Sequence, residues 1–253
     1  MSGSASPLFG SMRLRRMKQR VGRLLIPKLP ITRHVFNHLR WEVNASWVTL
    51  NNRINPVAIA KLRAVVDGSD LSVNVASGPC VKPGWVNIDL MKVTGVTLRY
   101  DCRRGLPFRD GSVARIRCEQ FLEHLDRGEE APLFLRSALR CLKHEGVLRI
   151  AVPDTELYLR TYASGDKRDW AAIGWDLDAL PAPFQTRIDV INHVFRQEEE
   201  HRYAYDFETL ERLLHETGFR TVIHQKFGES IDPELRDDLD VHKPFSLYVD
   251  AVR

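Results

Sequence analysis

VNVASGPCVKPGWVNIDL, residues 73–90, contains two short apolar runs separated by a segment that holds two glycines and two prolines. Runs rich in β-branched and aromatic residues, bounded by Gly and Pro, are typical of strands joined by turns. We therefore predict strands over residues 71–75 and 85–90, with a tight turn at residues 76–79. The small side chains of this turn would let backbone N–H groups approach a ligand closely.

The rest of the chain continues the same alternation of strands and helices. Further strand-like runs cover residues 96–100, 113–118, 146–152, 220–227 and 245–252. The clearest amphipathic helices are residues 129–143 and 206–217, the second with Asp206 as N-cap and Gly218 at its end. The pattern predicts one α/β domain with a mainly parallel, seven-stranded sheet and helices on both faces.

The N-terminal part of the chain has a composition of its own. Residues 1–41 hold nine Lys and Arg and no acid, whereas the remainder has more acids than bases. We predict a basic, mostly helical extension over residues 1–66, with an amphipathic helix at 12–25 that either docks on an anionic membrane or packs on the domain. Because the basic excess is confined to this extension, we expect no nucleic-acid partner.

Several classes of protein are disfavoured by what the sequence lacks. It has no run of 18 apolar residues and no N-terminal signal pattern, so we expect a cytoplasmic protein, at most peripheral to the inner face of the membrane. Its four cysteines are far apart, and no paired histidines at ligand spacing accompany them. We therefore expect reduced thiols and no metal. The sequence contains no signal for an oligomeric state.

Polar and small residues follow the predicted strands. In open α/β sheets, ligands bind beyond the carboxyl ends of the strands. Asp89 is placed to accept hydrogen bonds from two vicinal ribose hydroxyls, and Asp101 to meet an adenine amino group. The first turn has no G-x-G-x-x-G pattern, which disfavours a nicotinamide-dependent oxidoreductase.

Four stretches, in this order, resemble successive motifs of the type 11 class I S-adenosylmethionine-dependent methyltransferases. The resemblance is strongest to the branch associated with bacterial surface-polysaccharide and glycan pathways. The stretches are VNVASGPCVKPGWVNIDL (73–90), YDCRRGLPFRDGSVARIRCEQFLEHL (100–125), LRCLKHEGVLRIAVPD (139–154) and YDFETLERLLHETGF (205–219). The resemblance implies a Rossmann-like domain over residues 67–253, whose last strand is antiparallel.

The resemblance also implies a site for S-adenosylmethionine. Its cofactor-binding residues would be Ala76, Ser77 and Gly78 at the methionine part, Asp89 and Leu90 at the ribose, Asp101 and Cys102 at the adenine, and Glu119 and Gln120 beside them. The chain departs from the family pattern at four positions. Asn74 stands where an acid is common, Ala76 and Cys80 replace two of three glycines, and Ala114 replaces a common aspartate.

The acceptor implied by the resemblance is a small molecule or a glycan, with O-methylation of a sugar as the leading prediction. A hydroxyl acceptor needs a base, and we predict His124 for this role because imidazole titrates near neutral pH. The long aromatic segment at about 154–205 is predicted to cover the acceptor pocket. Its candidate substrate contacts are Asp154, His193, His201 and Tyr203, each of which could equally be structural.

Two alternatives stay open at this point. The altered glycine loop could mark a degenerate domain that binds cofactor or a partner without catalysis. A nucleic-acid methyltransferase would explain the basic extension, but the chain has no Asn/Asp-Pro-Pro-aromatic motif and no recognisable RNA-binding module. Stoichiometric cofactor binding without turnover would favour the degenerate domain.

Overall fold

The computed structural model describes residues 32–253, so the predicted helix at 12–25 and its membrane contact lie outside the described residues. Residues Val48–Arg253 form one compact unit, and the part of α2 (Arg33–Ile54) before Val48 belongs to another. α3 (Pro56–Val66) begins at Pro56, where the Asn55 side chain accepts hydrogen bonds from two backbone amides of the first turn. Within residues 32–253, no helix combines the length and apolar character needed to cross a bilayer.

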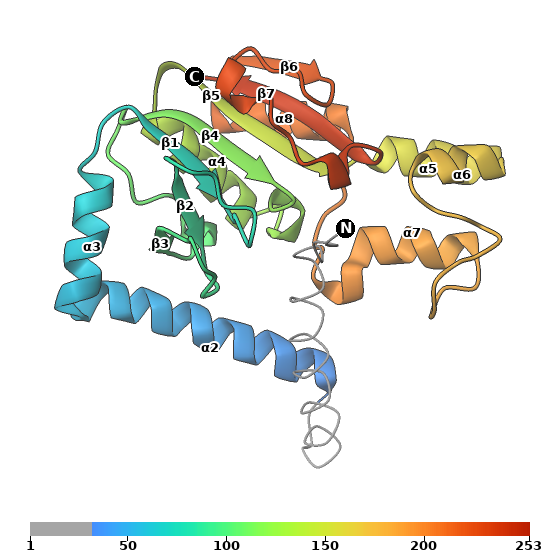
Figure 1. The fold of residues 1–253 in the computed structure, drawn as a ribbon, viewed down its shortest axis with the longest axis horizontal. Coiled ribbons are helices and arrows are strands. Elements are labelled where there is room, and N and C mark those ends of the chain that lie inside the picture. The colour runs from blue at the N-terminus through green and yellow to red at the C-terminus, as the bar shows by residue number, and fades with distance from the viewer. Residues whose placement is uncertain (1–31) are drawn as a thin grey trace, which may run out of the picture. The chain divides into compact units, whose positions relative to one another are not determined.

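Seven strands form one sheet in the order β3-β2-β1-β4-β5-β7-β6 (Figure 1). They are β1 (Leu71–Val75), β2 (Val86–Asp89), β3 (Leu98–Arg99), β4 (Val113–Glu119), β5 (Leu142–Pro153), β6 (Thr221–Gln225) and β7 (Ser246–Val252). All neighbouring pairs are parallel except the two that involve β7. The sequence prediction of a mainly parallel, seven-stranded α/β sheet with an antiparallel last strand is confirmed.

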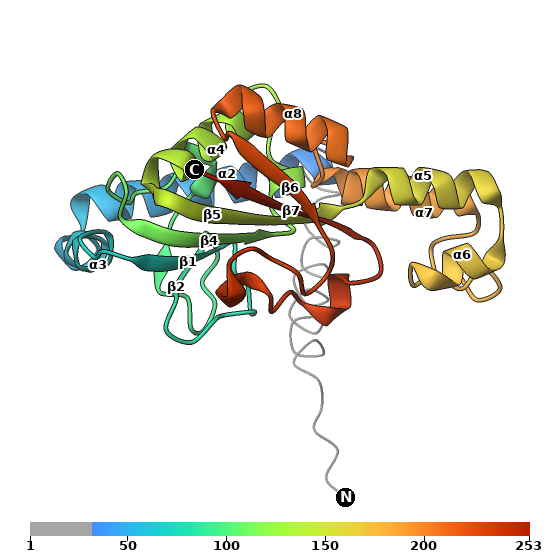
Figure 2. The same cartoon turned by 90° about the horizontal axis from the view of Figure 1, so that it is seen from above.

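One face of the sheet is apolar and is covered by α4 (Glu130–Cys141) and α8 (Phe207–Thr217), which lie on the same side in Figure 2. Ile116 and Cys118 on β4 alternate toward this face and are fully buried, as are Phe134 on α4 and Leu213 on α8. Burying one such side chain stabilises the fold by about 1.5–3 kcal/mol. The amphipathic pattern of these two helices therefore fixes them against the sheet.

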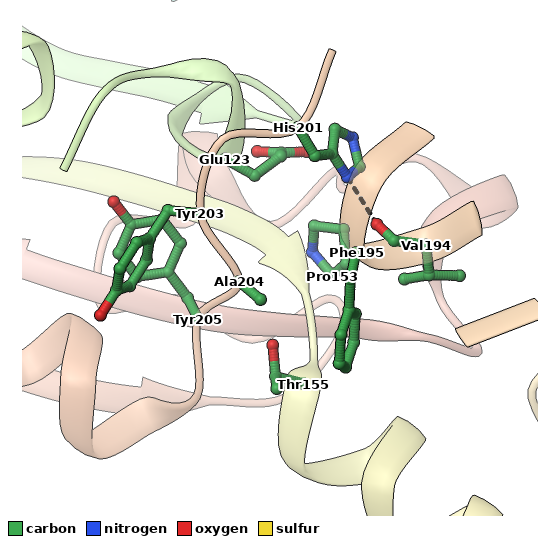
Figure 3. A pocket seen from close by; sticks show the side chains of 9 residues that line it. All are labelled: Glu123, Pro153, Thr155, Val194, Phe195, His201, Tyr203, Ala204 and Tyr205. Atoms are coloured by element: carbon green, nitrogen blue, oxygen red, sulfur yellow. Dashed lines mark hydrogen bonds between the residues drawn. The ribbon is translucent and has the colours of Figure 1, made fainter. Parts of the chain in front are cut away.

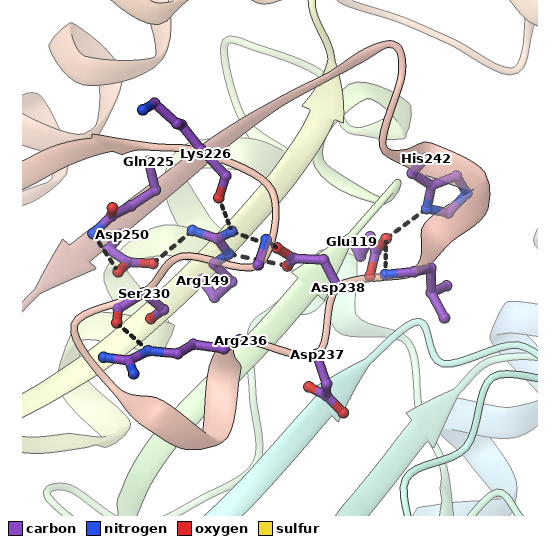
Figure 4. Close-up of polar contacts among 12 residues, drawn as sticks. Glu119, Arg149, Gln225, Lys226, Ser230, Arg236, Asp237, Asp238, His242 and Asp250 are labelled. Atoms are coloured by element: carbon purple, nitrogen blue, oxygen red, sulfur yellow. Dashed lines mark hydrogen bonds and ion pairs between the residues drawn. The ribbon is translucent and has the colours of Figure 1, made fainter. Parts of the chain in front are cut away.

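The other face is polar and is covered by the β6–β7 connection, residues 226–245, which carries the short 3-10 helices η5 (Pro233–Leu235) and η6 (Asp240–His242) (Figure 2). Arg149 on β5 is buried on this face. Its guanidinium pairs with Asp238 at 2.6 Å and with Asp250 at 3.2 Å (Figure 4). Ion pairs thus replace apolar packing on this face.

The segment between β5 and α8 forms α5 (Thr155–Ser164), α6 (Lys167–Ala172), α7 (Arg187–Arg196) and η4 (Gln197–Glu199). These helices have an apolar core of their own around Trp170, Tyr158 and Val190. Figures 1 and 2 both place them beyond the carboxyl end of β5. The segment predicted to cover the acceptor pocket therefore extends from the edge of the sheet at which ligands bind.

Candidate functional site

The turn after β1 has an open side. Ala76 and Gly78 both have positive φ, 51° and 49°, and no atom lies within 4 Å of the point where a Cβ on Gly78 would stand. Between them, the backbone N–H of Ser77 donates to the Ile88 carbonyl at 3.1 Å. The Ser77 hydroxyl is buried and has no hydrogen-bond partner among the residues that the structure describes. The turn thus combines a buried polar group that lacks a partner with a backbone position at Gly78 that leaves room for a ligand.

Asp89, at the end of β2, is fixed against this turn. Its Oδ2 accepts from the backbone N–H of Gly78 at 2.8 Å, and its Oδ1 from that of Met91 at 2.6 Å. A carboxylate has about four lone-pair sites, so each oxygen can still accept a second hydrogen bond. Leu90 is buried, and its carbonyl accepts from the Arg99 guanidinium at 3.1 Å.

Asp101 begins the 3-10 helix η2 (Cys102–Arg104) after β3 and is buried. Its carboxylate accepts one hydrogen bond from the Arg103 backbone and two from the Arg103 guanidinium. Burial raises the pKa of the Cys102 thiol well above its usual value, and the charges of Asp101 and Asp89 add to this. The ends of β2 and β3 therefore meet around Cys102.

Asn74 and Asn87 form an amide pair between β1 and β2. The Asn74 side chain donates to Asn87 Oδ1 at 2.9 Å and to the Cys80 carbonyl at 3.0 Å. Asn87 in turn donates to the carbonyls of Lys82 and Trp85. This pair closes the loop between β1 and β2, and an acid at position 74 could not donate either bond.

Glu119 and Gln120, at the end of β4, are engaged by later parts of the chain. The Glu119 carboxylate pairs with Arg117 and accepts from His242 Nδ1 at 2.6 Å (Figure 4). The Gln120 side-chain amide donates to Ser246 Oγ at 3.0 Å, and its backbone N–H to the Ala151 carbonyl. Both side chains thus link β4 to the C-terminal part of the chain.

His124 and His201 lie together. His124 ends the 3-10 helix η3 (Leu122–His124), and its ring centroid is 4.7 Å from that of His201. The Nδ1 of each ring is hydrogen-bonded to a carbonyl, His124 to Glu200 at 3.0 Å and His201 to Val194 at 2.6 Å. Burial lowers the pKa of both imidazoles, that of His201 to about 4. Both rings are therefore neutral at pH 7, with the lone pair on Nε2.

Glu123 is a residue that our list of site candidates missed. It is 1% exposed, and neither carboxylate oxygen has a hydrogen-bond partner within residues 32–253. Burial raises its pKa to about 8. It lines a small pocket with His201, Tyr203 and Tyr205, which has room for about one ordered water (Figure 3). In the sequence, its position next to His124 in the stretch FLEHL (121–125) was the one indication that Glu123 could belong to the site.

The other substrate candidates differ in position. Tyr203 lines the same pocket, and its backbone N–H donates to the Glu123 carbonyl at 3.2 Å. Asp154 is the N-cap of α5 and accepts from the Leu157 amide at 3.1 Å, while burial raises its pKa. His193 packs against Phe184, with ring centroids 4.9 Å apart. The structure therefore brings His124, His201 and Tyr203 together, and gives Asp154 and His193 local packing and capping contacts.

No family model and no curated protein sequence matches this chain. Solved structures that resemble it include a SAM-dependent methyltransferase of Thermotoga maritima, described as a possible histamine N-methyltransferase. The TM-score is 0.45 and the sequence identity 17%, and the match covers 87% of this chain and 96% of that chain. A SAM-dependent methyltransferase of Archaeoglobus fulgidus matches with a TM-score of 0.43 and 15% identity, and the match covers 82% of this chain and 99% of that chain.

A third similar structure contains ligands. It is the 1,6-didemethyltoxoflavin-N1-methyltransferase of Burkholderia thailandensis, with bound 1,6-didemethyltoxoflavin and S-adenosylhomocysteine. Its TM-score is 0.42 and its identity 12%, with 100% of this chain and 92% of that chain covered. The acceptors named for these neighbours belong to them and identify none for this chain.

Proposed function

We propose that this chain is a class I S-adenosylmethionine-dependent methyltransferase with its cofactor across the carboxyl ends of β1, β2 and β3. The observation that carries the proposal is the Asp89 carboxylate, which accepts a hydrogen bond from the Gly78 backbone. The preceding residue, Ser77, has a buried hydroxyl without a partner in the described part of the chain. These groups sit at the edge of a parallel sheet where nucleoside cofactors bind. The four-motif resemblance supports the same choice of cofactor.

The residues present fit the cofactor part by part. Asp89 would accept from the two ribose hydroxyls, while Ser77 and the open side of Gly78 would take the methionine part. Asp101 already accepts three hydrogen bonds from Arg103, which leaves about one lone-pair site for an adenine amino group. The bound cofactor would supply a methyl group activated by its sulfonium, and the protein has to align the acceptor and remove a proton.

For the acceptor we propose a small molecule or glycan that presents a sugar hydroxyl at the pocket lined by Glu123, His201 and Tyr203. His124 is our proposed base for that hydroxyl. Its Nδ1 donates to the Glu200 carbonyl, so its Nε2 carries the lone pair that would take the proton. The aromatic segment that extends from β5 would exclude water from the reacting atoms.

The proposal is tested by incubating the full chain with methyl-labelled S-adenosylmethionine and a panel of nucleotide-linked and lipid-linked sugars. We expect label on at least one sugar, and a kcat lowered by about 100-fold in His124→Gln at unchanged cofactor affinity. His144→Gln, a substitution of an exposed histidine on β5, is the matched control and should leave kcat unchanged. Cofactor binding without label on any acceptor would instead favour a degenerate domain.

A further inference from the structure

Three potential metal ligands meet in one place at the carboxyl edge of the sheet. Glu123 and His124 come from η3, the 3-10 helix after β4, and His201 comes from the segment before α8. One ligand atom from each lies within 4.8 Å of the other two. Figure 3 shows the Glu123 carboxylate and the His201 imidazole at the same end of the pocket. Their separation along the chain is why no ligand spacing is visible in the sequence.

The two imidazoles are oriented as metal ligands are. Carbonyl oxygens only accept hydrogen bonds, so Nδ1 of His124 must donate to Glu200, and Nδ1 of His201 must donate to Val194. Each ring therefore presents the lone pair of Nε2. A hydrogen bond from the far nitrogen to a backbone carbonyl is the usual support of a metal-bound histidine, because it fixes both tautomer and ring orientation.

The Glu123 side chain is the independent observation that points to a ligand. It is 1% exposed, and neither carboxylate oxygen has a hydrogen-bond partner in the described part of the chain. Buried carboxylates are costly unless they are paired or bind a metal ion. Glu123 has neither an Arg nor a Lys partner among the ion pairs of the described residues, and a bound cation would supply the partner that its carboxylate lacks.

We propose that Glu123, His124 and His201 bind one divalent transition-metal ion of the Zn²⁺ type. Two imidazoles and one carboxylate are the ligands of a catalytic zinc site, whereas Ca²⁺ and Mg²⁺ prefer oxygen ligands alone. Tetrahedral ligation at 2.0–2.1 Å places ligand atoms roughly 3.3 Å apart. The three ligand atoms would therefore have to move up to about 1.5 Å closer to one another. Rotation of the Glu123 side chain would help, because its carboxylate makes no hydrogen bond in the described part of the chain.

Such an ion would keep an open coordination position toward the pocket, which Glu123 and His201 also line. This step rests on the proposed function: the open position would take the acceptor oxygen and favour loss of its proton. In the loaded protein His124 is then a ligand and not the base: the ion would lower the pKa of the bound hydroxyl, and the proton would pass to a water molecule in the pocket. The binding site itself does not depend on methyl transfer.

The test is Zn²⁺ titration of the full chain, without a histidine tag, against a chromophoric chelator. We expect one ion per chain, with an affinity weakened about tenfold or more in each of Glu123→Gln and His201→Gln. His144→Gln, which removes an exposed histidine of β5, should bind as the wild type does. Co²⁺ should give the visible absorption of a four- or five-coordinate site in the wild type and lose it in both variants.

Two results would overturn the metal site: a wild type without stoichiometric Zn²⁺, or an affinity unchanged in both variants. Glu123→Gln keeps the shape of the side chain, and retained binding of S-adenosylhomocysteine would verify that the variant is folded. A chain that binds Zn²⁺ but not S-adenosylhomocysteine would refute the proposed function and leave the metal site standing. A chain that binds S-adenosylhomocysteine but not Zn²⁺ would refute the metal site and leave the proposed function standing.

Discussion

Ala76 has a φ of 51°, a left-handed conformation in which a Cβ lies too close to the following carbonyl oxygen. Glycine adopts this conformation without that strain, although it loses more chain entropy on folding. We therefore expect Ala76→Gly to raise the free energy of unfolding by about 0.5–1 kcal/mol. Urea unfolding would measure the change.

The control for this prediction is Ala58→Gly, a substitution inside α3, where φ is helical and glycine should destabilise. Stabilisation at position 76 together with destabilisation at position 58 is the expected pair of results. Equal destabilisation at both positions would contradict the left-handed conformation of Ala76.

Single residues divide into those that the sequence predicts and those that it does not. Asp89 follows a recognisable strand at a fixed distance from a glycine turn, so its place at the strand end could be predicted from spacing alone. Glu123 could not, because its importance comes from burial and from His201, which reaches it from a distant part of the chain. The Asn74–Asn87 pair is likewise visible only when β1 and β2 lie side by side.

At the scale of elements, α8 begins with a cap whose contribution can be isolated. The Asp206 side chain accepts from the Thr209 amide at 2.8 Å. Hydrogen bonds from the Thr209 side chain and from its backbone hold the pKa of the Asp206 carboxyl below the usual value. We expect Asp206→Ala to lower the free energy of unfolding by about 1 kcal/mol at pH 7. Denaturant unfolding would measure it, with Glu211→Ala on the same helix as control.

The pH dependence of this effect has a definite sign. A carboxyl whose pKa is lower in the folded chain stabilises the fold above its unfolded pKa of about 4, and loses that contribution as the pH falls through the folded value. The difference between Asp206→Ala and the wild type should therefore shrink below about pH 4. A difference that grows on acidification would contradict the cap.

Elements with strong boundary signals were predicted well. α8 ends at Thr217 before Gly218, as the sequence indicates, and β1 has the predicted bounds. β5 begins at Leu142 rather than at Gly146, because Val113 on β4 pairs with Leu142, a residue that reads as the end of a helix. The helices α5–α7 also carry caps, among them Asp154 and Gly165 at the two ends of α5. We nevertheless predicted this segment only as a cover of the acceptor pocket, and its helices pack around Trp170.

At the scale of the whole molecule, Arg149 joins three separate parts of the chain. On β5 it pairs with Asp250 on β7 and with Asp238 in the β6–β7 connection, and all three side chains are buried. Removing the cation would leave two buried carboxylates without their partner. We expect Arg149→Leu to lower the free energy of unfolding by about 3–5 kcal/mol.

Arg160→Leu is the matched control for Arg149→Leu, since it removes an arginine from an exposed pair with Glu156 on α5. Thermal and urea unfolding should show little change in this variant. A similar small effect for Arg149→Leu would contradict the view that the β6–β7 connection is held to the sheet by ion pairs. The sequence could not predict this polar face, because the pairs join residues far apart in the chain.

The central claim is that the edge formed by β1, β2 and β3 binds an adenosyl cofactor, and calorimetric titration with S-adenosylhomocysteine tests it most directly. The account predicts micromolar binding by the wild type and by Asp110→Ala, an exposed position before β4, and loss of that binding in Asp89→Ala. Thermal unfolding of each variant controls for misfolding. A folded wild type that does not bind, or an Asp89→Ala that binds equally well, would contradict the account.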